Sequence, residues 1–330
     1  MHHPPPLGLS ILDAFGNTPM IELGRIVENR GLDGRLLAKL EYLSPGHSKK
    51  DRIALEMIRG ARADGLLAEG QTVVELTSGN TGTGLAIVCR ALGHPFVAVM
   101  SKGNTVERAR MMQALGAEVV LVEQAPGSPP GQVSGRDLEL VEERTEELVR
   151  LCGAFRANQF ALQAAVIAHE RFTGPEIWEQ SQGRVDVFLD FVGTASTLTG
   201  VMRFLRSRNA NVRGYAVEPA SAPALAFGEI SNLSHSIQGG GYGKGDVELP
   251  LFDPSLVTGY LTVTDEQAVD GARLLAREEG IFGGYSSGAH CSTAIELLAQ
   301  RERGATIAFL ICDSGLKYLS TDLYPRGASS

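Results

Sequence analysis

The sequence lacks the features that would assign it to a membrane, secreted or nucleic-acid-binding class. No apolar run is long enough to cross a bilayer, and residues 1–10 lack both the basic region and the apolar core of a signal peptide. Positive charge is in deficit: the formal net charge is −8, which argues against nucleic acid or an anionic membrane as a partner. A local basic pocket for one small anion is not excluded by that charge.

Cysteine is scarce, and its spacing does not suggest a metal site. Cys89, Cys152, Cys291 and Cys312 form no Cys-x-x-Cys pair and have no accompanying histidine cluster. We interpret them as buried free thiols and therefore expect a reducing, cytoplasmic compartment. With 330 residues, 43% hydrophobic and 21% charged, the composition is that of a globular enzyme with room for two domains.

Strand-like and helical segments alternate along the chain. Strand patterns cover 35–42, 71–77, 95–100, 117–122, 183–193, 212–219 and 305–313. Helical patterns cover 50–65, 82–93, 105–116, 137–153, 196–209, 265–280 and 286–300. This βαβ rhythm predicts a parallel sheet covered by helices. Segments 123–137 and 235–250, rich in glycine or proline, are expected to be loops.

Two adjacent lysines stand at the start of the first long helix, where a cation is unfavourable. At 3.6 residues per turn, Lys50 falls on the apolar face with Ile53, Ala54, Met57 and Ala61, while Lys49 falls on the polar face with Arg52, Glu56 and Arg59. We therefore expect Lys49 to be solvated. Burial and the helix dipole would lower the pKa of Lys50 and make it a nucleophilic amine, although an inward lysine can also reach solvent or pair with a buried acid.

Three loops combine small residues and hydroxyls with the start of a helix. They cover Glu75–Gly84, Asp190–Gly200 and Phe282–His290. Backbone N–H groups at a positive helix end hold phosphates and carboxylates, but tight turns and helix caps use the same residues. The first two loops match neither the P-loop nor the dinucleotide fingerprint. Taken together with an inward lysine, they indicate a ligand with a phosphate, another with a carboxylate, and an amine between them.

The combination of these segments resembles the fold-type II pyridoxal-phosphate enzymes, specifically the cysteine synthase / cystathionine β-synthase family. The likeness runs nearly end to end, from Asn17–Leu23 to Asp313–Thr321, through the lysine segment, the three loops and Asn158–Phe160. The resemblance implies an α/β fold of two three-layer αβα domains with mostly parallel sheets, similar to the tryptophan synthase β chain. It also implies pyridoxal 5'-phosphate as the cofactor, a homodimer, and no metal.

Residue roles follow from the same resemblance. The lysine of Ser-x-Lys-Asp-Arg, which binds the cofactor as a Schiff base and acts in catalysis, matches Lys50. The resemblance assigns cofactor binding also to Asn80, Gly193, Thr194, Ala195, Ser196, Thr197 and Ser286. It assigns the substrate carboxylate to Thr77, Ser78, Gly79, Asn80, Thr81 and Gln159. Ser286 would face the pyridine nitrogen without a negative charge, which favours elimination and replacement over racemisation.

Three departures from the family pattern concern the site. Ala195-Ser196 stands where the family has Gly-Gly, which should still allow phosphate binding because both residues are small. His47 stands where the family has glycine, and Gly240 and Tyr242 lie in an altered glycine-rich loop. We expect His47, Gly240 and Tyr242 on the acceptor side of the site, although His47 can equally be a packing or exposed loop residue.

The resemblance implies β-replacement on O-acetylserine, O-phosphoserine or serine through an aminoacrylate intermediate, with sulfide, a thiol or an amine as nucleophile. Open alternatives are a serine/threonine ammonia-lyase, a specialised synthase of a nonproteinogenic amino acid, and a regulator without turnover. Partners would be small molecules, with no nucleic acid and no membrane. Residues 48–155 would form a smaller mobile domain with the carboxylate loop, and 10–47 with 156–322 a larger cofactor-phosphate domain. Residues 1–9 and 323–330 would be flexible termini.

Overall fold

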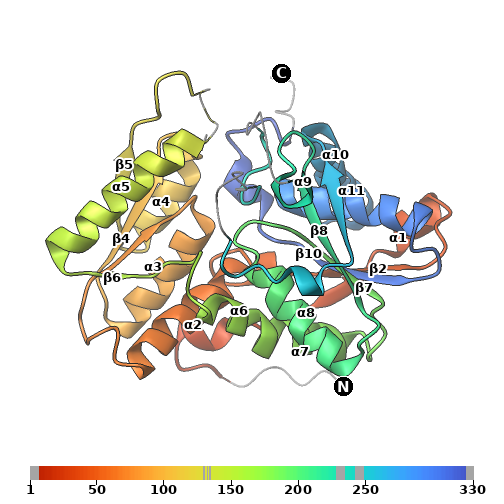
Figure 1. Cartoon of the computed structure of the whole chain (residues 1–330), viewed down its shortest axis with the longest axis horizontal. Helices are drawn as coiled ribbons and strands as arrows, with labels where there is room; N and C mark the ends of the chain where they lie inside the picture. The colour runs from red at the N-terminus through yellow and green to blue at the C-terminus, as the bar shows by residue number, and fades with distance from the viewer. Residues whose placement is uncertain are drawn as a thin grey trace.

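Two separate β-sheets organise the computed structural model, which describes residues 7–128, 131, 133, 135–227, 235–241 and 249–324. Figure 1 shows one sheet in each of two lobes. The larger sheet has the strand order β1-β2-β10-β7-β8-β9, and the smaller sheet has the order β5-β4-β3-β6. All described pairings are parallel except that of β1 with β2. The predicted α/β fold with two layered domains is therefore confirmed.

The larger sheet is a buried layer between helices. Its strands are β1 (Met20–Glu22), β2 (Arg35–Lys39), β7 (Val187–Phe191), β8 (Arg213–Pro219), β9 (Gly259–Val263) and β10 (Thr306–Leu310). Alternate residues of β10 pack into different cores: Ile307 and Phe309 join one apolar cluster, and Ala308 and Leu310 another. Since successive strand residues point to opposite faces, both faces of this sheet are covered. Its helices are α1 (Gly24–Asn29), α7 (Gly174–Gln180), α8 (Ser196–Arg208), α9 (Ala224–Phe227), α10 (Asp265–Glu279) and α11 (Tyr285–Gln300).

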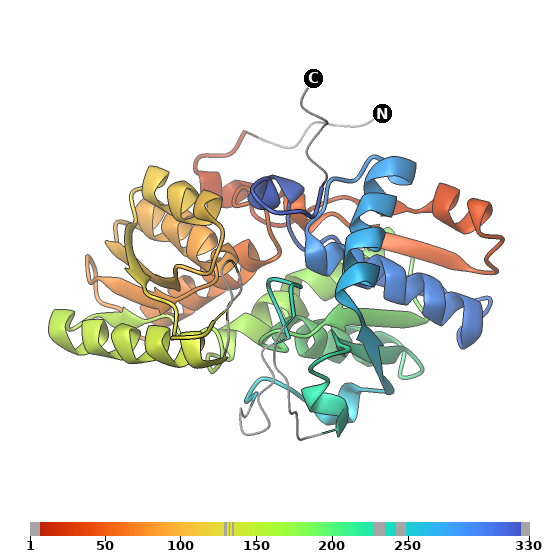
Figure 2. The same ribbon diagram turned by 90° about the horizontal axis from the view of Figure 1, so that it is seen from above.

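The smaller sheet has the same three-layer construction. Its strands are β3 (Val73–Leu76), β4 (Phe96–Ser101), β5 (Glu118–Val122) and β6 (Phe155–Arg156). In β4, Ala98 packs with one apolar cluster, and Val97 and Val99 with another. The surrounding helices are α3 (Asn80–Leu92), α4 (Val106–Ala114) and α5 (Gly135–Cys152), and Figure 2 shows α5 along the outer side of this lobe.

Helices α2 (Lys50–Ala63) and α6 (Ala164–Ala168) lie where the two lobes meet (Figure 1). Helix α2 packs against α3 and α6, and α6 packs in turn against α8. A single turn of π-helix, His169–Thr173, continues α6 into α7. The first turn of α2 therefore stands between the starts of α3 and α8, the two helices that follow the glycine- and hydroxyl-rich loops.

Most predicted elements are confirmed, and the misses have local causes. The strand expected over 35–42 ends at Lys39, because the chain enters a 3-10 helix, Glu41–Leu43, that turns the Glu41 side chain into the interior. Strands β1, β6 and β9, which are short or alternately exposed, and the short helices α1, α6, α7 and α9 were not predicted from the sequence. Within the described residues, no helix combines the length and apolar character that crossing a membrane requires.

Candidate active site

Three contacts bring distant segments together around the start of α2. Ser48 and Asp313 form an isolated antiparallel bridge, which joins the segment before α2 to the segment after β10. Asn80 Nδ2, at the start of α3, donates to Asp313 Oδ2 at 2.7 Å. The Asp190 carboxylate, near the end of β7, lies 2.6 Å from the Lys49 amine. The carboxyl ends of β3, β7 and β10 therefore face one site, as is typical of parallel α/β sheets.

Lys50 is the first residue of α2, and its amine is chemically accessible. The residue is 9% exposed, and no hydrogen bond of its side-chain nitrogen occurs among the described residues. Burial, and then the positive charge of Lys49, lower the pKa of Lys50 to about 8. The helix start also disfavours a cation there. A substantial fraction of this amine is therefore neutral near physiological pH, as nucleophilic or basic chemistry requires.

The prediction that Lys49 is solvated is wrong. Lys49 is 6% exposed and its amine contacts Asp190 Oδ1 at 2.6 Å. Burial alone would lower the pKa of Lys49, but the Asp190 carboxylate outweighs it and raises the pKa, so this lysine is held as a cation. The helix-wheel argument assumed that the polar face of α2 meets water. Because α2 lies between the lobes, that face meets paired charges of the protein instead.

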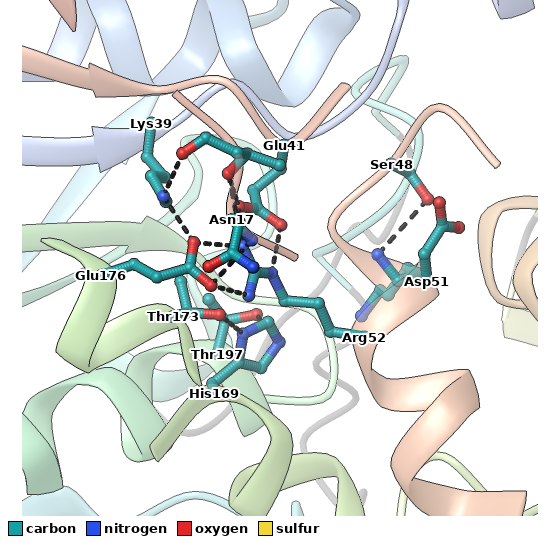
Figure 3. Close-up of polar contacts among 12 residues, drawn as sticks. Asn17, Lys39, Glu41, Ser48, Asp51, Arg52, His169, Thr173, Glu176 and Thr197 are labelled. Carbon is teal, nitrogen blue, oxygen red and sulfur yellow. Dashed lines mark hydrogen bonds and ion pairs between the residues drawn. The ribbon is translucent and has the colours of Figure 1, made fainter. Parts of the chain in front are cut away.

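Arg52, on the same polar face, is likewise buried and paired (Figure 3). Its guanidinium donates to Glu41 Oε2 at 2.7 Å and to Glu176 Oε1 at 2.7 Å, and Lys39 contacts Glu176 at 2.6 Å. Although burial raises the pKa of Glu176, the bonds from Arg52 and the charge of Lys39 bring it down to about 2. Each carboxylate in the network is thereby matched by a buried cation, and α2 is fixed to the larger lobe within the same turn that carries Lys50.

The loop between β7 and α8 has the geometry of an anion cradle. We call Gly193–Thr197 the β7–α8 loop. Among the described residues, no hydrogen bond uses its five backbone N–H groups, which lie at the positive end of the thirteen-residue helix α8. Ala195 adopts the left-handed φ of 64°, which turns the chain into the helix, and the Thr194 and Ser196 hydroxyls lie 3.0 Å apart. These groups can hold a phosphate.

A neutral histidine holds the hydroxyl at the end of this loop (Figure 3). His169 Nε2 lies 3.2 Å from Thr197 Oγ1, and His169 Nδ1 lies 2.9 Å from Thr173 Oγ1. Burial, and then the charges of Lys49, Lys50 and Arg52, lower the pKa of His169 well below its usual value. One ring nitrogen is therefore a donor and the other an acceptor, which fixes the Thr197 hydroxyl without adding charge.

The loop between β3 and α3 is shaped by its own first hydroxyl. We call Thr77–Thr81 the β3–α3 loop. Thr77 Oγ1 accepts the N–H groups of Gly79 and Gly82, each at 2.9 Å. The N–H groups of Asn80 and Thr81 have no acceptor among the described residues, and they lie at the start of a thirteen-residue helix. The Thr77 side chain is therefore structural, and the free N–H groups of its neighbours can receive a carboxylate.

Gln159 is brought to the same loop from a distant segment. Its Oε1 accepts the Thr81 hydroxyl at 2.6 Å, and its Nε2 donates to the Leu76 carbonyl oxygen at 3.2 Å. The backbone N–H of Gln159 donates to Glu75 Oε1 at 3.3 Å. Burial raises the pKa of Glu75 well above its usual value, although the charge of Arg156 opposes this shift. The structure thus places Gln159 beside the β3–α3 loop, as the resemblance implied, with its amide oxygen already engaged.

Asn80 is fixed by two polar partners. Its Nδ2 donates to Asp313 Oδ2, and its Oδ1 accepts a bond from Lys317 Nζ at 2.7 Å. Lys317 Nζ also donates to the Gly46 carbonyl oxygen at 2.7 Å. Burial lowers the pKa of Lys317 to about 8 despite the nearby Asp313 and Asp51. The second proton of the Asn80 amide is left for a ligand, since one Nδ2 group carries two donors.

The two adjacent serines at the start of α11 differ in the hydrogen bonding of their hydroxyls. The Ser287 hydroxyl accepts the backbone N–H of Cys312 at 2.9 Å and is fully buried. The Ser286 hydroxyl has no hydrogen bond among the described residues and is 6% exposed. Ser286 is thus the serine whose hydroxyl is available to a ligand.

His47 and Gly240, two of the residues expected on the acceptor side, lie in different environments. His47 has an exposed side chain and a left-handed φ of 59°, and its backbone pairs with Ser44 and Ser314. Gly240 is buried against the Phe191 ring, where an added Cβ would lie 2.7 Å away, close to the start of the β7–α8 loop. Tyr242 lies outside the described residues.

A buried cluster that the sequence analysis missed adjoins Lys49. Asp190, His290 and Cys312 bring one carboxylate, one imidazole and one thiol within 4.8 Å of one another. The N–H of Phe191 donates to His290 Nε2 at 2.6 Å, so the other ring nitrogen carries the proton and donates to the Leu310 carbonyl oxygen at 2.7 Å. Both ring nitrogens and the carboxylate are already engaged, which describes a hydrogen-bonded network rather than a metal site.

The four cysteines are free. Cys89, Cys291 and Cys312 are buried as expected, whereas Cys152 is exposed. The expectation of four buried thiols is wrong for Cys152 because it is the last residue of α5, where the helix meets solvent.

Comparison with known proteins identifies the family. A model described as pyridoxal-phosphate dependent enzyme matches residues 11–313. The chain belongs to this family. Cysteine synthase 3 of Caenorhabditis elegans is 40% identical over 317 residues, covering 94% of this chain and 88% of that protein. Cysteine synthase of Staphylococcus aureus is 37% identical over 318 residues, covering 96% of each. The crystal structure of an O-ureido-L-serine synthase matches with a TM-score of 0.87 and 38% identity, covering 98% of each chain.

The residues of this pyridoxal-phosphate dependent enzyme fit the cofactor. The phosphate requires several donors at a positive helix end, and the β7–α8 loop offers five N–H groups without an acceptor among the described residues. The aldehyde requires a neutral amine, which Lys50 with its lowered pKa provides. The hydroxyl of Ser286 and the second amide proton of Asn80 can meet the polar atoms of the ring.

Several neighbours of these groups carried at most a weak signal in the sequence. Asp190, His290 and Asp313 are polar residues inside apolar or glycine-rich runs, which is a weak hint of a buried polar cluster. Lys49 stood next to Lys50, but helical periodicity placed it on the wrong side. The partners of all four lie far away in the chain, so their pairing could not be deduced from spacing.

Proposed function

We propose that this enzyme catalyses β-replacement on a serine-type amino acid, with O-acetyl-L-serine, O-phosphoserine or serine as donor and sulfide, a thiol or an amine as nucleophile. The observation that carries the proposal is the buried amine of Lys50, with a pKa lowered to about 8, between two loops. One loop offers a phosphate, and the other a carboxylate, backbone N–H groups that have no acceptor among the described residues. The cysteine synthases to which it is similar support the donor class.

The cofactor supplies an aldehyde that bonds to an amine and a ring that acidifies the α-proton of the bound amino acid. Lys50, once its amine is released, takes that proton at Nζ and later returns it. The N–H groups of Asn80 and Thr81 and the hydroxyl of Ser78 hold the donor carboxylate. With O-acetylserine and hydrosulfide, the bond from Cβ to the acetyl oxygen breaks and acetate leaves. A bond from Cβ to sulfur then forms. Lys50 returns the proton that it took, so it ends the reaction in its starting protonation state.

The remaining site assignments are part of this proposal. Gly193, Thr194, Ala195, Ser196 and Thr197 hold the cofactor phosphate, and Ser286 meets the pyridine nitrogen. Gly79 and Gln159 keep the β3–α3 loop in shape, a role supported by the bond from Thr81 to Gln159. His47 and Gly240 face the acceptor, which for Gly240 is supported by its position against Phe191 beside the β7–α8 loop.

A specialised synthase is the second candidate, because the 38% identity to an O-ureido-L-serine synthase lies between the 37% and 40% identities to the two cysteine synthases. In O-ureido-L-serine, a ureido group is attached through oxygen to the β-carbon of serine. The nucleophile that forms this product by β-replacement would be hydroxyurea. The deciding experiment supplies O-acetyl-L-serine with sulfide, hydroxyurea or neither, and quantifies amino-acid products and pyruvate. We expect replacement product in excess over pyruvate. Pyruvate as the main product at saturating nucleophile would instead indicate an ammonia-lyase.

We further propose that residues 48–155 form a smaller domain and 10–47 with 156–322 a larger one, and that the enzyme is a cytoplasmic homodimer. The expected flexible termini, 1–9 and 323–330, lie largely outside the described residues. Free cysteines support a reducing compartment. Exposed Leu43, Leu316 and Leu319, on segments joined by the Ser48–Asp313 bridge, support an apolar contact surface. Light scattering during size exclusion tests the dimer, and a monomer mass would contradict it.

A further inference from the structure

A closed ring of hydrogen bonds ties the β3–α3 loop to the segment after β10. Arg108 Nη1 donates to the Ser78 carbonyl oxygen, and Arg108 Nη2 donates to the Tyr318 hydroxyl oxygen, both at 2.7 Å. The Tyr318 hydroxyl in turn donates to Asp313 Oδ2 at 2.7 Å, and Asn80 Nδ2 donates to the same oxygen at 2.7 Å. Since Ser78 and Asn80 belong to one loop, the backbone closes the ring.

The ring is built from fully buried groups. Arg108, Asp313 and Tyr318 are each 0% exposed. The Arg108 guanidinium also lies 4.9 Å from the centre of the Tyr318 ring, and that ring packs edge-on against Tyr285 at 5.2 Å. Charge-assisted hydrogen bonds are stronger than neutral ones and are costly to break when buried. The ring is therefore a stiff connection rather than a set of surface contacts.

Arg108 also fixes the shape of the loop by direct packing. Gly79 has a φ of 125°, and a Cβ added to it would lie 2.4 Å from Arg108 Cδ. The Arg108 stem thus occupies the space that a side chain at position 79 would need. Its guanidinium holds the Ser78 carbonyl oxygen on one side of the chain, and the N–H groups of Asn80 and Thr81 are left at the start of α3.

The ring joins the two lobes. Arg108 belongs to α4, which covers the smaller sheet, whereas Asp313 and Tyr318 follow β10 of the larger sheet. Thr105 Oγ1 adds a bond across the same contact, to the Lys317 carbonyl oxygen at 3.1 Å. The position of the β3–α3 loop is therefore set by both lobes together.

We propose that Arg108, Tyr318 and Asp313 are positioning residues that hold the β3–α3 loop in the orientation that receives the donor carboxylate. None of the three has to touch the donor. The inference rests on the proposed function only for the identity of that ligand. The mechanical part, that the ring restrains the loop, stands on the contacts alone and can be measured without a donor.

The first test replaces Tyr318→Phe in the cofactor-loaded enzyme, which keeps the aromatic packing and removes the hydroxyl in the middle of the ring. The matched control is Tyr215→Phe, near the start of β8, whose hydroxyl is also buried and donates to Glu302 at 2.6 Å. We expect the Kd of O-acetyl-L-serine to rise about tenfold in Tyr318→Phe, equivalent to about 1.4 kcal/mol, with kcat and the cofactor absorbance unchanged. Equal Kd values in native enzyme and Tyr318→Phe overturn the inference.

The second test is hydrogen exchange of residues 77–82 without donor. We expect exchange about tenfold faster in Tyr318→Phe and native in Tyr215→Phe, because loosening a buried connection lowers the local opening free energy by about 1.4 kcal/mol. Unchanged exchange in Tyr318→Phe overturns the inference. If Tyr318→Phe exchanges faster but the native enzyme binds no serine-type donor, the ring still positions the loop, and the proposed function is rejected instead.

A third variant tests whether the ring acts as a unit. Arg108→Lys keeps a cation but cannot donate to Ser78 and Tyr318 at once, because lysine lacks the fork of two nitrogens. Combined with Tyr318→Phe it should raise the Kd no further than Arg108→Lys alone. Fully additive effects would show that the two residues act separately and contradict the ring.

Discussion

The amine of Lys49 lies 2.6 Å from Asp190 Oδ1, whereas the amine of Lys50 has no hydrogen bond among the described residues. Two neighbouring lysines thus have opposite chemistry. The first is a paired cation, with its pKa raised by Asp190, and the second is a largely unpaired amine, with its pKa lowered to about 8 by burial and by the first. After burial, the positive charge of Lys49 is the second cause that lowers the pKa of Lys50.

Breaking the Lys49–Asp190 pair should destabilise the fold. Lys49→Met leaves the buried Asp190 carboxylate without its cation, so we expect the free energy of unfolding to fall by about 3–5 kcal/mol in denaturant titrations. The double variant Lys49→Met with Asp190→Leu should recover most of that loss. Arg136→Met, which removes an exposed pair with Glu139, is the control and should leave the free energy of unfolding close to that of the native enzyme. Equal losses in both single variants would contradict the pairing.

The lowered pKa of Lys50 predicts a pH-dependent reactivity in cofactor-free protein. The rate at which a small amine-reactive reagent labels Lys50, measured by peptide mass spectrometry, should rise with pH and have its midpoint near the pKa of about 8. A free lysine derivative, whose side-chain amine titrates at about 10.4, is the control and should react with a midpoint well above that of Lys50. A shared midpoint would contradict the account. Since the unfolded amine titrates near 10.5, the unfolded state binds more protons between the two values, so this group makes the unfolding free energy rise with pH there.

Carboxylate binding should depend on Ser78 and Gln159. Ser78→Ala removes a hydroxyl from the β3–α3 loop, and Gln159→Ala removes the acceptor that holds the Thr81 hydroxyl at 2.6 Å. Each should weaken binding of the true donor by roughly 1.5–3 kcal/mol, measured by titrating the cofactor absorbance, and leave the spectrum without donor unchanged. Gln71→Ala, which loses a bond to Gly153 at the protein surface, serves as control. Native donor affinity in both variants would reject this role.

The substitution His47→Gly should stabilise the folded protein. His47 has a φ of 59°, a region in which a Cβ is strained, so we expect His47→Gly to raise the unfolding free energy by about 1 kcal/mol. His47→Ala keeps the Cβ and should show no gain, which separates the backbone effect from loss of the imidazole. If both variants behave alike, the strain argument is wrong.

The acceptor-side prediction for His47 uses the same pair of variants. We expect both to change the preference among nucleophiles more than the rate of donor consumption. Equal effects on both half-reactions would assign His47 a structural role.

The sequence predicted the local features of the site and not the long-range ones. Helix α2 begins at Lys50 and carries Ile53 and Met57 on its buried face, as the periodicity required. The environment of Lys49 was missed because its partner Asp190 lies 141 positions away. A 3.6-residue period reports which face of a helix is apolar, but it cannot tell a solvated charge from one buried in a pair.

The same limit applies around the loops. The glycine and hydroxyl content of the β3–α3 and β7–α8 loops predicted anion-binding turns. Nothing local indicated that Asn80 meets Asp313 across 233 positions, or that Arg108 reaches Tyr318 across 210. These contacts exist because parallel sheets bring the carboxyl ends of distant strands together, and only the folded topology shows which polar side chains then meet.

The central claim is that Lys50, and not Lys49, bonds to the cofactor. The direct measurement is borohydride reduction of the cofactor-loaded enzyme, followed by peptide mass spectrometry of native protein, Lys50→Ala and Lys49→Met. Our account predicts the reduced cofactor on Lys50 in native enzyme and in Lys49→Met, and no covalent cofactor in Lys50→Ala. Reduced cofactor on Lys49 in the native enzyme, or its persistence on the protein in Lys50→Ala, would contradict it.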